Sequence, residues 1–146
     1  MDIIISEKPM KDVYTIKESK DYFIGEDNSI FYEAKGDFRK ILEKKQLDLI
    51  FNFEYSNYKD FIFYRNSGFN QVLAKLAKKR DIVIGFSFSK FKGCKNKYQI
   101  LGRLQQNYLI CKKYNVKTKI ASLSKKKEDP FVLKSFERLL NKKSLY

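Results

Sequence analysis

The chain has 146 residues, the size of one domain, and it is 43% hydrophobic and 16% aromatic, so it can bury a core. It contains no His, which excludes a His-ligated metal site, a Ser–His or Cys–His nucleophile pair and a His general base. The formal net charge is +14, but residues 1–65 carry a net −2 and residues 66–146 a net +16.

The first part of the chain predicts short strands and one short helix. Residues 2–6 form an apolar run that we expect to be an edge strand. Residues 22–25 and 30–32 are apolar runs on either side of a turn-prone segment, which allows a hairpin or two parallel strands. Residues 36–45 have helical apolar spacing. Residues 47–53 are almost continuously hydrophobic, which is typical of a strand in a parallel sheet.

Strands and helices alternate from this point to the end of the chain. The predicted elements are a helix after the N-cap pair Asn66 and Ser67, a strand over residues 81–88, a helix from Asn96 to about Tyr114, a strand over residues 117–123 and a helix over residues 131–141 with Pro130 in its first turn. This alternation predicts right-handed βαβ units and the α/β class. No Gly/Pro-rich linker divides the chain, so we expect a single domain over residues 1–146.

The strongly basic second half predicts a polyanionic partner, and nucleic acid is the commonest one inside cells. Lys accounts for 26 of the 31 basic residues, which favours contacts to phosphates over reading of base edges. In α/β folds the functional surface lies at the carboxyl ends of the strands. We therefore expect RNA contacts from five lysines in the loops after the strands at residues 81–88 and 117–123. They are Lys90, Lys92, Lys125, Lys126 and Lys127.

A competing interpretation is a small Mg²⁺-dependent nuclease. Asp27, Glu33 and Lys35 follow the pattern D-x₅-E-x-K, in which two carboxylates could hold the metal and a lysine could position a water. Such short patterns recur by chance in a highly charged chain, and exposed hairpin charges are the favoured explanation. A third interpretation is a generic basic RNA-binding domain.

Two further features remain open. Arg103, Gln106 and Asn107 lie off the apolar stripe of the helix predicted after Asn96, so they form either a solvated face or a face that contacts RNA or a partner. Residues 61–64 read FIFY and cannot all point inward, so one face of this block could meet a protein partner.

The two cysteines and the hydropathy pattern bear on localisation. Cys94 and Cys111 are too few for a Cys₄ zinc site, and free thiols fit a reducing, intracellular setting. No uncharged run is long enough to span a bilayer, and the first residues lack the basic segment of a signal peptide. We therefore expect a cytoplasmic protein with no membrane partner.

A longer motif resembles a known family. Residues 65–77 read RNSGFNQVLAKLA, residues 81–87 read DIVIGFS and residues 100–107 read ILGRLQQN. Over about residues 64–122 the chain resembles the archaeal ribonuclease P protein component 3 family. The resemblance implies an α/β, TIM-barrel-like fold related to the polymerase and histidinol phosphatase (PHP) domain. Because 146 residues are too few for eight βα units, we expect a shortened, incomplete barrel with a parallel sheet.

The resemblance also implies a function. It implies a non-catalytic, RNA-binding subunit that pairs with ribonuclease P protein component 2 and stabilises the catalytic RNA. That RNA removes the 5′ leader from precursor tRNA, with Mg²⁺ expected on the RNA and no cofactor on this chain. Arg65, Ser67, Asn70 and Arg103 match the polar positions of the motif, and Arg65 and Arg103 are predicted to face RNA.

Overall fold

The computed structural model describes residues 1–35, 37–43, 46–55, 59–60 and 65–142. Its strands form one sheet of seven, ordered as in the chain. They are β1 (Asp2–Ile5), β2 (Val13–Glu18), β3 (Phe23–Gly25), β4 (Ile30–Glu33), β5 (Leu49–Phe51), β6 (Val83–Ser87) and β7 (Thr118–Ala121). Neighbours are parallel except at β2–β3 and β3–β4, which are antiparallel. The predicted α/β class and largely parallel sheet are therefore confirmed.

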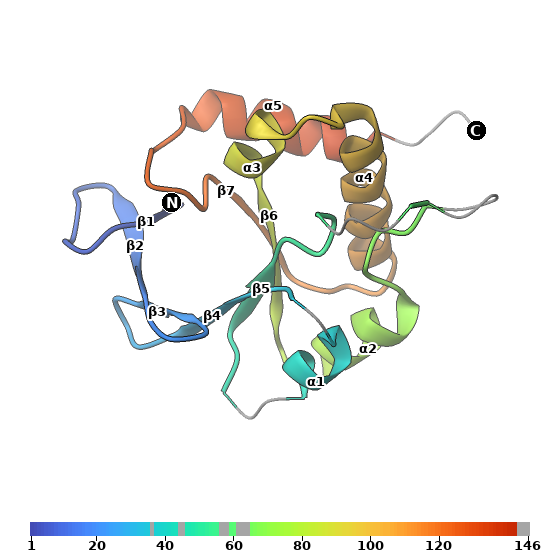
Figure 1. Cartoon of the computed structure of the whole chain (residues 1–146), viewed down its shortest axis with the longest axis horizontal. Coiled ribbons are helices and arrows are strands. Elements are labelled where there is room, and N and C mark those ends of the chain that lie inside the picture. The colour runs from blue at the N-terminus through green and yellow to red at the C-terminus, as the bar shows by residue number, and fades with distance from the viewer. Residues whose placement is uncertain (36, 44–45, 56–58, 61–64, 143–146) are drawn as a thin grey trace.

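The sheet curls until its first strand meets the segment after its last one (Figure 1). The backbone N–H of Leu123 donates to the carbonyl of Ile3 at 2.9 Å, and that of Ile5 donates to the carbonyl of Ser124 at 2.8 Å. The Asp2 carboxylate accepts a further bond from the backbone N–H of Ser122 at 2.7 Å. This seam makes the sheet nearly a closed barrel. The strand expected at residues 2–6 is confirmed as β1, which stands at one edge of the strand order, and the segment after β7 covers that edge.

Helices cover one side of the barrel. They are α1 (Phe38–Leu42), α2 (Gln71–Lys79), α3 (Phe88–Gly93), α4 (Lys97–Lys113) and α5 (Pro130–Leu140). In Figure 1 these helices surround β5, β6 and β7, whereas β1, β2 and β3 form the opposite wall, where no helix of the described chain lies. The strongly basic residues 66–146 therefore supply most of the helical side, whereas β1, β2 and β3 come from the part of the chain with a net charge of −2.

Alternating side chains on the strands create two apolar layers. One lies between the sheet and the helices, and its buried members include Ile50, Ile84, Phe86, Leu104, Tyr108 and Phe136. The other fills the barrel, and its buried members are Ile3, Ile16, Phe31, Leu49, Phe51, Ala121 and Leu123. A Cβ on Gly85 would lie only 2.9 Å from Cδ2 of Leu49, which shows how tightly the interior of this small barrel is packed.

The start of α2 differs from the prediction. Its N-cap is Asn70, whose side-chain oxygen accepts from the backbone N–H of Leu73 at 3.0 Å. The predicted N-cap pair Asn66 and Ser67 lies outside the helix, because Gly68 has a φ of +76° and turns the chain before the helix can start. The segment from Asn66 to Asn70 is thus a loop that packs beside the helix.

Candidate nucleic-acid interface

The carboxyl ends of β6 and β7 present a cluster of lysines that we call the basic rim. Its exposed members are Lys90, Lys92, Lys125, Lys126 and Lys127. Lys90 and Lys92 lie on α3, which begins directly after β6, and the other three lie in the loop that follows β7. The hydroxyl of Ser124 donates to that of Ser89 at 3.0 Å and joins the two loops. The structure thus brings together lysines that the sequence places about 35 residues apart.

Two buried serines fix the backbone under the basic rim. Ser87 caps α3 by accepting from the backbone N–H of Lys90 at 3.3 Å, and its hydroxyl donates to the carbonyl of Ser122 at 3.1 Å. The hydroxyl of Ser122 accepts from the backbone N–H of Glu128 at 3.0 Å. Because both side chains are 1% exposed or less, the two loops are held together by bonds that water does not compete for.

Carboxylates neutralise part of the rim. Glu33, at the end of β4, pairs with Lys90 at 3.2 Å, and Glu128 pairs with Lys92 at 3.4 Å. Burial acts to raise the pKa of Glu33, but hydrogen bonds from Asn52 and Lys90 outweigh it and hold that pKa below its usual value. Within the described part of the chain, residues 125–127 have no ion pair to a carboxylate. They therefore carry the rim's unneutralised charge.

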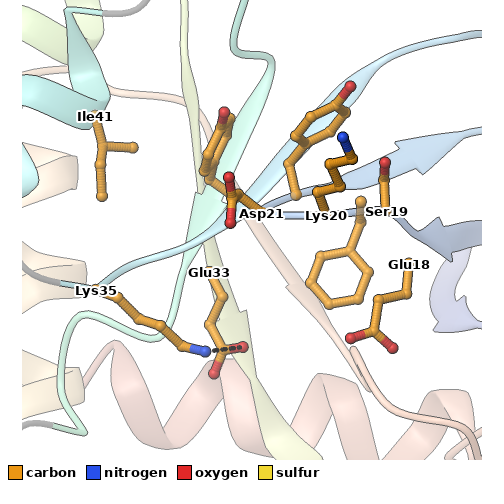
Figure 2. Close-up of a pocket in the computed structure, with 10 residues that line it drawn as sticks. Glu18, Ser19, Lys20, Asp21, Glu33, Lys35 and Ile41 are labelled. Atoms are coloured by element: carbon orange, nitrogen blue, oxygen red, sulfur yellow. Dashed lines mark ion pairs between the residues drawn. The ribbon is translucent and has the colours of Figure 1, made fainter.

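Glu33 also lines a cavity of about 360 Å³ beside the rim (Figure 2). The cavity lies between the β2–β3 turn, the end of β4 and α1, and its charged members are Glu18, Lys20, Asp21, Glu33 and Lys35. In Figure 2 the dashed line joins Lys35 to Glu33, a distance of 3.8 Å. Because three carboxylates and two ammonium groups line it, the cavity does not favour an anionic ligand.

The proposed nuclease triplet is not assembled. Lys35 lies near Glu33, but Asp27 precedes β4 whereas Glu33 ends it, and a strand advances about 3.3 Å per residue. Asp27 is engaged at the other end of the barrel by the hydroxyl of Tyr14 and by the backbone N–H of Ser29. Across the described residues, no group of three or more His, Cys, Asp or Glu side chains could hold a metal ion. The structure therefore does not bring the three residues of the nuclease interpretation into one site.

A groove of about 650 Å³ lies between α1, the start of α2 and α4. Three of the four polar motif residues line it, namely Arg65, Ser67 and Asn70. Arg65 and Asn70 are exposed there. Ser67 is only 2% exposed, and its hydroxyl donates to the carbonyl of Phe69 at 3.1 Å and accepts from Gln106 at 3.0 Å. Ser67 thus stabilises the loop before α2 and does not present its hydroxyl to a partner, contrary to its predicted role in RNA contact.

Arg103 does not face solvent, so the prediction that it faces RNA does not fit its position. Its side chain is 1% exposed, and its Nε donates to Oδ1 of Asp60 at 3.0 Å. Its Nη1 donates to the backbone carbonyl of Glu54, also at 3.0 Å. Burial acts to raise the pKa of Asp60, but the backbone N–H of Asn66 and Arg103 outweigh it and lower that pKa. The polar face of α4 is thus a packing surface for the segment that connects β5 to α2.

Glu54 lies at the centre of this packing surface. It is fully buried, and the Asn107 amide nitrogen donates to its Oε1 at 3.0 Å. Oε2 of Glu54 and Oδ1 of Asn107 are both buried acceptors without a hydrogen-bond partner among the residues that the structure describes. Burial raises the pKa of Glu54 to about 7. A proton on Oε2 gives this buried carboxyl group a donor, and with a pKa of about 7 the neutral acid predominates only below that pH.

Gly68 is required by the geometry of this region. Its φ is +76°, and a Cβ there would lie 2.4 Å from the carbonyl oxygen of Phe53. We expect Gly68→Ala to lower the free energy of unfolding by about 2 kcal/mol, because the left-handed conformation alone costs about 1–2 kcal/mol for a residue with a Cβ. Chemical denaturation measures this. Gly93→Ala is the control, because a Cβ there meets nothing within 4 Å. Equal stability of the two variants would contradict the argument.

Comparisons with known proteins leave the family unassigned. No known protein family matches the chain. No curated protein matches it either.

The block at residues 61–64, one face of which could meet a protein partner, lies outside the described residues. In the described parts of the chain, no helix has the length and apolar character needed to cross a membrane.

Proposed function

We propose that this chain is a non-catalytic, RNA-binding protein subunit of the archaeal ribonuclease P type, which stabilises a folded RNA by neutralising its phosphates. The observation that carries this proposal is the one-sided charge of the barrel. Residues 82–127, which include β6, α3, α4, β7 and the basic rim, contain no Asp or Glu. Such a segment attracts a polyanion, and the carboxylates that pair with the rim from outside it, Glu33 and Glu128, engage only Lys90 and Lys92.

The resemblance over residues 64–122 supports the choice of RNA. On this proposal the catalytic RNA performs the cleavage of precursor tRNA with its own Mg²⁺, and ribonuclease P protein component 2 is the protein partner. The chain contributes the basic rim and the exposed Arg65 and Asn70, and it requires no cofactor. A cytoplasmic setting, where precursor tRNA is processed, belongs to the same proposal.

Removing the unneutralised charge of the rim is expected to weaken RNA binding and reduce its dependence on salt. The variant Lys125→Gln/Lys126→Gln/Lys127→Gln loses three cations that have no carboxylate partner in the described structure. We expect the slope of log affinity against log salt to become shallower by about 2, because each lost phosphate contact removes roughly 0.7–0.9. Filter binding or fluorescence anisotropy at several salt concentrations measures this.

The matched control is Lys11→Gln/Lys17→Gln/Lys20→Gln, which removes the same charge from exposed positions on the wall without helices. We expect this control to change the slope much less. If both triple variants lower affinity equally, the chain binds RNA through its net charge alone, and the rim has no special role.

Reconstitution separates the ribonuclease P proposal from a generic basic RNA-binding domain. We expect the chain to raise cleavage of precursor tRNA when it is added to ribonuclease P RNA and component 2. The rim variant should lose this effect, and the control variant should retain it. Enrichment of ribosomal RNA in place of ribonuclease P RNA, on co-purification from cells, would favour the generic domain.

A further inference from the structure

A second basic cluster lies between α2 and α4, away from the basic rim. The ring of Tyr114 has Nζ of Lys75 and Nζ of Lys113 each 5.6 Å from its centre. Its hydroxyl donates to Oε1 of Gln71 at 2.9 Å, which fixes the ring between the two helices. Together with Lys78, these residues form what we call the α2–α4 edge. One aromatic ring thus holds two ammonium groups close to a single point on the surface.

The charge of the α2–α4 edge is not neutralised by the described protein. Gln71, Lys75 and Lys78 lie on one face of α2, because positions i, i+4 and i+7 share a helix face. Lys75, Lys78 and Lys113 are exposed, and none of them forms an ion pair with a carboxylate of the described chain. Asp81, the acid that follows α2, pairs instead with Lys117 at 3.0 Å.

The helix dipole explains the positions of only two of the three lysines in the α2–α4 edge. Lys78 and Lys113 lie in the last turns of α2 and α4, where a cation interacts favourably with the helix dipole. Lys75 lies in the middle of α2 and gains nothing from the dipole. Its ammonium group is held against Tyr114, so the pair of cations is preorganised for an external run of phosphates.

The edge and the rim are far apart. α4 begins beside α3, which carries Lys90 and Lys92, and its last residue is Lys113. A helix of 17 residues, rising about 1.5 Å per residue, separates its two ends by roughly 25 Å. A single phosphate group therefore cannot reach both clusters, and each of them contacts phosphates of its own.

We propose that the α2–α4 edge is a second RNA-contact surface, so that one copy of this chain bridges two stretches of RNA backbone. This inference rests on the proposed RNA-binding function, and it adds a second contact surface at a separate place on the protein. A protein with cations at two separate places acts as a tether between RNA segments. This explains how a small chain could hold a larger RNA compact without covering it.

A bridging experiment tests the proposal with two RNA hairpins that carry a donor and an acceptor dye. We expect equimolar wild-type chain to raise energy transfer between them. The edge variant Lys75→Gln/Lys78→Gln/Lys113→Gln should still bind one hairpin through the rim but lower energy transfer to the background value. The charge-conserving variant Lys75→Arg/Lys78→Arg/Lys113→Arg should restore it, which shows that loss of bridging is not loss of folding.

Each outcome decides between the two proposals. If the wild-type chain binds no RNA, the proposed function fails and the bridge fails with it. If the chain binds RNA without raising energy transfer, or if the edge variant bridges as well as wild type, only the bridge is overturned. A mixture of the edge variant and the rim variant should not bridge. Restored energy transfer in that mixture would show that a dimer makes the link, which also overturns the proposal.

Discussion

Glu54→Gln is expected to stabilise the fold at pH 8 and to leave its stability unchanged at pH 4. Burial raises the pKa of Glu54 from its usual 4.5 to about 7, so the folded state holds this proton more tightly than the unfolded chain does. The stabilisation is fully present below about pH 4.5 and is lost as the pH rises through 7. The shift in the pKa of Glu54 corresponds to a loss of about 3 kcal/mol in the free energy of unfolding between pH 4 and pH 8.

Glutamine also suits the local geometry. Oε1 of the new amide accepts from Asn107 as Glu54 does now, and Nε2 takes the place of the unpartnered Oε2. The amide nitrogen supplies a donor at this buried position without a proton from solvent. The charged groups that act on Glu54 from packed elements are Arg103 and Lys90, and neither is altered by the substitution.

Urea denaturation of both proteins from pH 4 to pH 9 measures the effect. The difference between the two curves isolates Glu54, because the other carboxylates titrate equally in both. Glu7→Gln is the control at an exposed position and should leave the two curves parallel. A Glu54→Gln protein less stable than wild type at pH 8 would show that the ionised carboxylate is required there.

Arg103→Met should be the most destabilising single substitution on α4, with a loss of about 3–5 kcal/mol in the free energy of unfolding. Methionine preserves much of the length of the side chain but removes the donors to Asp60 and to the carbonyl of Glu54. The carbonyl then lies in a buried site without this donor, and Asp60 loses its ion pair. Thermal and chemical denaturation measure the loss.

Lys97→Met, at an exposed position on the same helix, removes the same charge and should change stability by less than about 0.5 kcal/mol. The pair of variants also tests the role of Arg103 in RNA binding. At a temperature where both proteins are folded, their RNA affinities should be similar, since Arg103 is 1% exposed. A specific loss of affinity in Arg103→Met would restore the prediction that this arginine faces RNA.

The second half of the fold, apart from the short helix α3, could be predicted because its signals are local. Asp129 accepts from the backbone N–H of Phe131 at 2.8 Å and Pro130 occupies the first turn, so α5 begins where the sequence indicates. The strands β6 and β7 are short apolar runs between such helices. The first half was harder, and β2 was missed because its six residues include Lys17 and Glu18 and lack continuous hydrophobicity. The antiparallel β3–β4 pairing settled one alternative that the sequence left open.

Only part of the candidate site could be predicted from the sequence. The five lysines of the basic rim could be found because strand ends and loops are readable from the sequence, although their contact with RNA stays a prediction. The burial of Arg103 and Asn107 could not be found, because their partners lie 40 or more residues away along the chain. The α2–α4 edge was missed for the same reason, since Lys75 and Tyr114 meet only in the folded protein.

The seam between β1 and the segment after β7 has a consequence for biosynthesis. It joins Asp2 to Ser122, residues 120 positions apart, so it cannot form until most of the chain has left the ribosome. Until then, backbone groups of β1 and β7 stay open to pairing with other nascent chains. Such long-range closure slows folding. The time that the ribosome takes from Asp2 to Ser122 therefore adds to the period in which each new copy is prone to aggregate.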